Sequence, residues 1–360
     1  MEARQMNVLS LLGKEGVRYE IPPFQRSYAW DRSQCEDLLT DVVRAAREHR
    51  QHFASAILYV ACSPDAADGG TSSPPPTCFH VVDGQQRLTT ISLMLLALCR
   101  KLEKDGACIS GTDARTLSET YLKIGQRTKL LLSPADRETL HALIFGEPLP
   151  AHPSHHVVDN LAYFQEQLEA PECSPDLVWT GLGSLFCVAI QLDEADRPQA
   201  VFESLNAKGA ALTTADMVRN YLLFGKSHAE QQRLYLECWE PMQALFGDDP
   251  GSLRMNNAIL GWLSVRSPKN RAHRDKQAFR VFRQYFEQHY DGSVEALLAE
   301  LHSFCLVWAE NYRYHAVKNY RSADWASIGK KTLVSDRPKK QASEEALHYY
   351  AQHFGINVAH

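Results

Sequence analysis

The chain has 360 residues, of which 44% are hydrophobic and 22% are charged, and its formal net charge is -5. This composition is ordinary for a globular protein, and so mild a negative charge excludes a global electrostatic attraction to nucleic acid. No run of about 18 apolar residues occurs, so the sequence predicts no membrane association, and residues 1–5 lack the apolar core of a signal peptide. The length allows a sizeable core, and we expect two lobes.

The N-terminal residues predict alternating short helices and strands. Residues 7–13 fit a short helix, and residues 17–21 alternate apolar and polar side chains as a strand does. The next residues read Pro-Pro-Phe-Gln-Arg-Ser-Tyr-Ala-Trp, and the two prolines favour an extended segment that presents Gln25 and Arg26 near aromatic side chains. A surface loop with buried aromatics and a solvated Arg26 is the alternative interpretation. We expect a helix over residues 31–49.

The most informative stretch is His-Val-Val-Asp-Gly-Gln-Gln-Arg-Leu-Thr-Thr, residues 80–90. An apolar strand, an Asp83-Gly84 turn and a buried helix beginning near Gln86 follow one another. The free N–H groups of the helix start favour an anion, Gly84 allows close approach, and Arg87 adds a forked cation suited to phosphate. A common turn and cap with a solvated arginine is the alternative.

The sequence also predicts strands over residues 52–61 and 185–192, and helical pieces between about 117 and 170. After residue 192 we expect a helix, a glycine-containing turn and a second helix. Asn206 and Lys208 fit the end of the first helix, and Asp216 fits the first turn of the second. Those capping roles explain these polar side chains without a ligand.

The remaining chain is helical in pattern from about 226 to 312, and residues 266–340 are basic. Basic and aromatic side chains are interleaved there, as on a helix that faces DNA. A solvated basic face over an aromatic core is the alternative. The residues are Arg266, Lys269, Arg271, Arg274, Lys276, Arg280 and Arg283, with Phe279, Phe282, Tyr285 and Phe286.

The nine cysteines are scattered, and none of them forms a C-x-x-C pair. Several lie in apolar stretches. This distribution fits the reduced thiols of a cytoplasmic protein better than disulfides or a zinc site. The positions are Cys35, Cys62, Cys78, Cys99, Cys108, Cys173, Cys187, Cys238 and Cys305.

Three motifs together resemble the GmrS-type family, the N-terminal domain of GmrSD modification-dependent restriction systems, also found in SspE and BrxU defence proteins. They are residues 21–30, residues 82–90, and residues 202–209 with Leu212 and Asp216. Their order and spacing match over roughly residues 1–225. The resemblance implies an α+β fold with two parts. Residues 1–225 would form a small nucleotide-binding domain that resembles the ParB/sulfiredoxin fold, with a mixed sheet and a helical insertion. Residues 226–360 would form a mainly helical, basic region.

The resemblance further implies a nucleoside-triphosphate-binding and hydrolysing sensor, with Mg²⁺, that acts in restriction of modified DNA such as glucosylated or phosphorothioate DNA. Asp83, Gln85 and Arg87 would be the catalytic residues: Arg87 would stabilise phosphoryl charge, Gln85 or Gln86 would orient water, and Asp83 would hold the metal. The other nucleotide-binding residues would be Gly84, Gln86, Thr89, Gln25, Arg26, Asn206, Lys208, Asp216 and Asn220.

Two other functions stay open, a non-hydrolysing nucleotide switch that controls DNA binding and a ParB-like nuclease acting through Asp83 and Arg87. A P-loop enzyme is excluded, because the sequence has no G-x-x-x-x-G-K-[ST] motif. Many family members carry an HNH nuclease domain, but His348, His353 and His360 lack the companions that such a site needs. We therefore expect either a truncated chain or a nuclease domain or subunit that acts in trans, with modified DNA as a further partner and the possibility of a homo-oligomer.

Overall fold

The computed structural model describes residues 2–62, 76–193, 213–224, 226–247, 253–267 and 275–319. The chain divides into two compact units, Met1–Gly209 and Ala210–His360. Within the described residues, none of the helices combines the length and apolarity that crossing a membrane requires.

The first unit is built on a mixed sheet of six strands in the order β1-β8-β3-β4-β2-β7. Strands β8 and β3, β4 and β2, and β2 and β7 are parallel, whereas β1–β8 and β3–β4 are antiparallel. The predicted α+β fold with a mixed sheet is therefore confirmed. The strands are β1 Glu2–Asn7, β2 Val17–Glu20, β3 His52–Cys62, β4 Thr77–Asp83, β7 Leu130–Leu131 and β8 Leu185–Leu192, and a separate pair is formed by β5 Lys123–Ile124 and β6 Arg127–Thr128.

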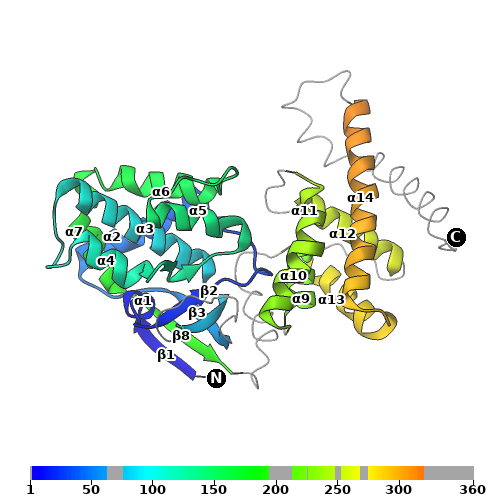
Figure 1. Ribbon diagram of the computed structural model, residues 1–360, viewed down its shortest axis with the longest axis horizontal. Coiled ribbons are helices and arrows are strands. Elements are labelled where there is room, and N and C mark those ends of the chain that lie inside the picture. Colours follow the sequence, from blue (N-terminus) through cyan, green and yellow to red (C-terminus); the bar gives the residue numbers. More distant parts are fainter. Residues whose placement is uncertain are drawn as a thin grey trace. The chain divides into compact units, whose positions relative to one another are not determined.

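Helices of this unit gather on one side of the sheet (Figure 1). The longest, α3, is buried along nearly its whole length because leucines and small residues occupy all of its faces. It packs against α4 and α6, while α2 packs against α7. The helices are α1 Val8–Leu12, α2 Arg32–Glu48, α3 Gln85–Asp105, α4 Ala114–Tyr121, α5 Pro134–Phe145, α6 His155–Gln167 and α7 Pro175–Ser184, with a 3₁₀ turn at Pro171–Cys173.

The second unit is helical where it is described, as predicted. Its core includes Trp239, Trp262 and Phe282, each of which is at most 2% exposed. Its elements are α9 Thr214–Leu223, α10 His228–Leu234, a π-helical turn Tyr235–Trp239, α11 Glu240–Ala244, α12 Leu253–Arg266, α13 Asp275–His289 and α14 Val294–Asn319.

Three sequence-based expectations for the first unit are wrong. Strand β1 was not predicted, and the short strands β5 to β7 lie where we expected helical pieces. Cys62 and Cys78 are not free thiols, because they form a disulfide across the β3–β4 pair. The partners of β1 and β7 are distant in sequence, and the two cysteines are 16 residues apart, so local pattern does not reveal these pairings. Strands β5 and β6 pair with each other as a short hairpin.

A buried carboxylate ties the segment after β2 to helix α5. Asp136 Oδ2 accepts hydrogen bonds from the Tyr28 N–H (2.7 Å) and the Ser133 hydroxyl (2.8 Å), and Oδ1 accepts one from the Ser154 hydroxyl (2.7 Å). Burial raises the pKa of Asp136 in spite of these hydrogen bonds. The carboxylate therefore holds the 21–30 segment in place at an electrostatic cost.

We expect Asp136→Ala to lower the free energy of unfolding by about 2 kcal/mol, because it leaves buried donors without their acceptor. Glu138→Ala, which removes an exposed carboxylate from the same helix, is the control and should change stability by less than about 0.5 kcal/mol. Chemical denaturation of both variants measures the difference. Equal stabilities would contradict the structural role of Asp136.

Candidate functional site

Two of the predicted motifs meet at one edge of the sheet. Because β2 and β4 are parallel, their C-terminal ends lie at the same edge, and residues 21–30 and the Asp83-Gly84 turn follow those ends. The Gln25 side chain donates a hydrogen bond from Nε2 to the Val82 carbonyl oxygen at 3.0 Å. This buried bond joins two segments that are 57 residues apart in sequence.

The turn after β4 leaves the start of helix α3 open. Gly84 is the N-cap residue, with a φ of 95°, and no side chain caps the helix there. Asp83 Oδ1 accepts a hydrogen bond from the Gly84 N–H at 2.8 Å. The N–H groups of the first helical turn have no intrahelical acceptors, so they favour an anion at this end of α3.

Two of the predicted site residues, Arg26 and Arg87, act electrostatically on the carboxylate of Asp83. Burial raises the pKa of Asp83, while the Gly84 N–H, the Arg87 guanidinium and the Arg26 guanidinium each lower it. The guanidinium carbon of Arg87 also lies 5.7 Å from the centre of the Trp30 ring. We call the place where β2 and β4 end, with Arg26, Asp83 and Arg87, the Asp83 corner. It combines one half-buried carboxylate with two guanidinium cations.

Two neighbouring glutamines of α3 do different things. Gln86 holds the 21–30 segment: its Oε1 accepts from the Ala29 N–H at 2.9 Å, and its Nε2 donates to the Ser27 carbonyl at 3.2 Å. Gln85 is 8% exposed, and its buried Oε1 accepts no hydrogen bond from the residues that the structure describes. That oxygen is placed to accept a hydrogen bond from a water or a ligand.

The residues of this corner fit a polyphosphate with a divalent cation. Two guanidinium groups and the open helix start favour phosphate oxygens. Asp83 offers the single carboxylate that Mg²⁺ commonly takes from a protein when phosphates and water supply its other ligands. Cation binding would also offset the cost of burying the charged form of Asp83.

Comparison with known protein families agrees with the motifs. The family model for the N-terminal domain of the GmrSD restriction endonuclease matches residues 8–223, which is more than half of the chain. The chain belongs to this family. It therefore carries a domain of restriction systems, and the predicted resemblance is confirmed. No curated protein matches the chain.

The other predicted site residues of this GmrSD-family chain belong to α3, to α9 of the second unit, or to residues outside the described part of the chain. Thr89 is buried, and its hydroxyl donates a hydrogen bond to the Gln85 carbonyl oxygen, one turn earlier in α3. The Thr89 hydroxyl is therefore used within the helix. Asp216 and Asn220 lie on α9 of the second unit, where Asp216 accepts hydrogen bonds from Thr213 in a capping box. Asn206 and Lys208 lie outside the described residues. The roles predicted for these four residues stay predictions.

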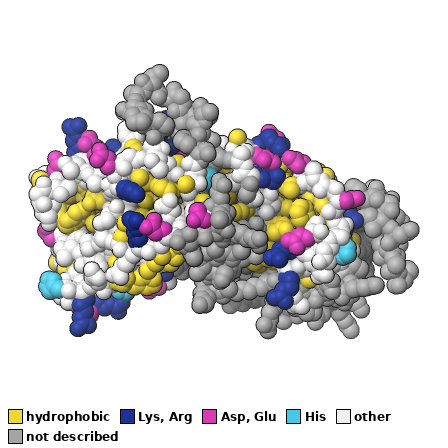
Figure 2. Space-filling view, turned by 90° about the horizontal axis from the view of Figure 1, so that it is seen from below, with side chains coloured by type: hydrophobic (Ala, Val, Ile, Leu, Met, Phe, Trp, Pro, Cys, Tyr) yellow, Lys and Arg dark blue, Asp and Glu magenta, His cyan; other side chains and the backbone are white. Residues whose placement is uncertain are grey.

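The described part of the basic segment favours its structural interpretation. Phe279 and Phe282 of α13 are buried, and the ring of Tyr221 packs against both of them edge-on. Arg283 is exposed and pairs with Glu287 at 3.2 Å. Figure 2 shows Lys and Arg side chains interspersed with Asp and Glu on the face it displays. Phe279 and Phe282 therefore fill a core, where they cannot stack on bases, whereas Tyr285 and Phe286 of the same helix are partly buried.

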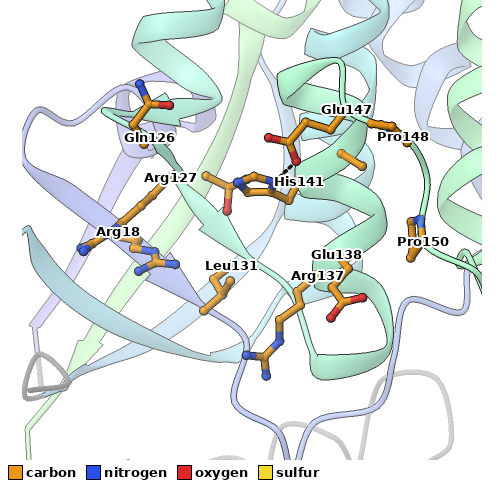
Figure 3. A pocket seen from close by; sticks show the side chains of 12 residues that line it. Arg18, Gln126, Arg127, Leu131, Arg137, Glu138, His141, Glu147, Pro148 and Pro150 are labelled. Carbon is orange, nitrogen blue, oxygen red and sulfur yellow. Dashed lines mark ion pairs between the residues drawn. The ribbon is translucent and has the colours of Figure 1, made fainter. Parts of the chain in front are cut away.

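The first unit also contains a cavity of about 450 Å³ that sequence reasoning missed. Arg18 and Arg127 lie across it from α5, which carries Arg137 and His141 (Figure 3). His141 Nδ1 pairs with Glu147 at 3.3 Å. None of the predicted site residues lines this cavity. Its residues come from four separate stretches of the chain, so no local motif marked it.

Gly84→Ala should lower the free energy of unfolding by about 2–3 kcal/mol, because an L side chain is strained at this φ. Its Cβ would also lie 3.1 Å from Ile57 Cγ1 and 3.3 Å from the Ala56 carbonyl oxygen. Gly111→Ala is the matched control: its φ is 77°, with nothing within 4 Å, so only the strain of about 1 kcal/mol applies. Equal losses in denaturation experiments would contradict a role for close approach at Gly84.

The raised pKa of Asp83 predicts a pH-dependent stability difference without nucleotide or metal. An aspartate whose folded-state pKa lies above its unfolded-state value destabilises the fold once it ionises, so stability falls as pH rises through that window. Asp83→Asn keeps an oxygen acceptor for the Gly84 N–H and does not ionise.

Its melting temperature should match that of the wild type at pH values below the ordinary aspartate pKa of about 4. It should exceed the wild-type value at neutral pH. Thermal melts across this range test the sign, and a wild type that gains stability relative to Asp83→Asn as pH rises would refute it.

Proposed function

We propose that this chain is the nucleoside-triphosphate-binding and hydrolysing sensor of a restriction system that acts on modified DNA. The observation that supports this most directly is the corner where β2 and β4 end. There Arg26 and Arg87 act on Asp83 beside the open start of α3. The membership of the GmrSD family supplies the restriction context.

In this proposal, each residue of the corner has a separate role in binding or hydrolysing the triphosphate. Arg87 and Arg26 neutralise charge on the phosphate chain, and the first N–H groups of α3 add fixed dipoles. Asp83 would hold Mg²⁺ against the phosphates, and Mg²⁺ would supply charge neutralisation there. The buried Oε1 of Gln85 would accept a hydrogen bond from the attacking water and so orient it. Gln86 keeps the 21–30 segment against this corner.

The sequence analysis left two alternative functions open, and the experiment below distinguishes them from the proposed sensor. A nucleotide switch would bind triphosphate at this corner and control DNA engagement without releasing phosphate. A nuclease would cleave phosphodiesters with Asp83 and Arg87. The proposed sensor differs from both, because it releases phosphate and leaves DNA cutting to a nuclease partner.

Binding and phosphate release should be measured with ATP, GTP, CTP and UTP in the presence of Mg²⁺. Unmodified, glucosylated and phosphorothioate DNA are then added in turn. We expect phosphate release from at least one triphosphate, with a rate that responds to modified DNA. Binding without release would favour the switch, and plasmid nicking that Asp83→Ala abolishes would favour the nuclease.

We expect Arg87→Gln and Asp83→Asn to weaken triphosphate binding by about tenfold or more, since each removes a charged contact. Arg127→Gln is the control. It removes an arginine from the same unit but from the separate cavity, so binding should stay near the wild-type value. Wild-type affinity in both corner variants, or an equal loss in Arg127→Gln, would overturn the assignment of the site.

A further inference from the structure

Three neighbouring strands of the sheet bring four metal-ligating side chains together, away from the Asp83 corner. Cys62 of β3 is paired with Cys78 of β4, and Glu20 of β2 is paired with His80 of β4. Cys78 and His80 are two residues apart on one strand, so their side chains lie on the same face. This group of residues, Glu20, Cys62, Cys78 and His80, is called the sheet cluster below.

Three ligand atoms of the sheet cluster lie close enough together for one ion, and His80 adjoins them through Glu20. The two sulfurs and a carboxylate oxygen of Glu20 all lie within 4.8 Å of one another. Nε2 of His80 lies 3.8 Å from Glu20 Oε2. A tetrahedral zinc site separates its ligand atoms by roughly 3.3–3.8 Å, so movements of about 1 Å would bring Glu20 and the two sulfurs into place. His80 would turn toward them from its present position beside Glu20 to supply the fourth ligand.

Burial and charge also suit a metal. Cys78 is 6% exposed, and the side chains of Glu20 and His80 are each 13% exposed. Arg18 Nη1 lies 3.5 Å from Glu20 Oε1. Two thiolates and a carboxylate around Zn²⁺ carry a net charge of −1, which the adjacent guanidinium balances.

The sulfurs are joined as a disulfide in the structure. A dithiol reductant returns them to thiols: it delivers two electrons and two protons to the S–S bond and is itself oxidised to a disulfide. Compartments that keep thioredoxin or glutathione reduced favour the thiol form. The reduced pair is held on adjacent strands in register, so both sulfurs stay next to Glu20 and His80.

We propose that the reduced chain binds one Zn²⁺ through the thiolates of Cys62 and Cys78, the carboxylate of Glu20 and the imidazole of His80. Binding releases the two thiol protons. All four positions of the tetrahedron come from the protein, so the site is structural and has no open position for catalysis. It fastens β2, β3 and β4 together, and disulfide formation excludes it because both sulfurs are then used.

The experiment uses the full chain, reduced with a phosphine that is then removed under anaerobic conditions, and titrated with Co²⁺. We expect about one equivalent to bind, with the absorption of tetrahedral cobalt and a sulfur-to-cobalt charge-transfer band that Zn²⁺ abolishes. The same chain oxidised with a diazene should bind no Co²⁺ with this band. Absence of the band in the reduced wild type overturns the proposal, whatever the variants do.

Substitutions in the sheet cluster locate the site. Cys62→Ser should weaken the sulfur-to-cobalt band, the double variant Cys62→Ser/Cys78→Ser should remove it, and Glu20→Gln should weaken binding about tenfold or more. Cys108→Ser is the control, because Cys108 is an exposed free cysteine outside the sheet cluster. A band that survives in the double variant, or that is lost in Cys108→Ser, overturns the assignment to the sheet cluster. These measurements require no nucleotide, so their outcome is independent of the proposed triphosphate site.

Discussion

The parallel pairing of β2 with β4 is the constraint on which the candidate site depends. It brings the ends of two distant segments to one edge of the sheet, and the bond from Gln25 to the Val82 carbonyl joins them there. Without this pairing, Arg26 and Asp83 would belong to unrelated loops. Gln86 and the buried carboxylate of Asp136 then fasten the same segment to α3 and α5. A corner fixed by this many buried bonds loses little conformational freedom when it binds a ligand.

Two groups in the corner lower the stability of the protein without a bound ligand. Burial raises the pKa of Asp83, and the Oε1 of Gln85 is buried without a hydrogen bond from the described residues. A fold under selection for stability alone would replace such groups with apolar ones of similar size. A carboxylate disfavoured by burial and an amide oxygen without a donor are the groups that a cation and a water satisfy. This pairing of local cost with a matching ligand is typical of functional sites.

The same strands carry polar groups along much of their length. On β2, Arg18 borders the arginine-lined cavity and contacts Glu20, which belongs to the sheet cluster, and the strand then runs into the segment that holds Arg26. On β4, Cys78 and His80 precede the Asp83 corner. The proposed metal site and the proposed nucleotide site therefore share β2 and β4, and the cavity borders β2.

The sequence by itself determined the elements whose signals are local. The apolar run, the Asp83-Gly84 turn and the helical periodicity of α3 lie within one continuous stretch, so each could be read without knowing its partners. Strand β1 could not be read in this way: its six residues are mostly exposed and have no apolar alternation. It is a strand because β8 offers an edge to pair with.

Within the candidate site, tertiary structure decided which residue does what. Gln85 and Gln86 are identical neighbours, and sequence reasoning assigned either of them to the attacking water. They lie about 100° apart around the helix axis, so only one of them faces the 21–30 segment. The packing of that segment therefore gives Gln86 its hydrogen bonds and leaves the Oε1 of Gln85 without a donor among the described residues. The cysteine pair was also decided by tertiary structure. The register of β3 on β4 places Cys62 beside Cys78, and the spacing of the two residues in the sequence does not reveal this.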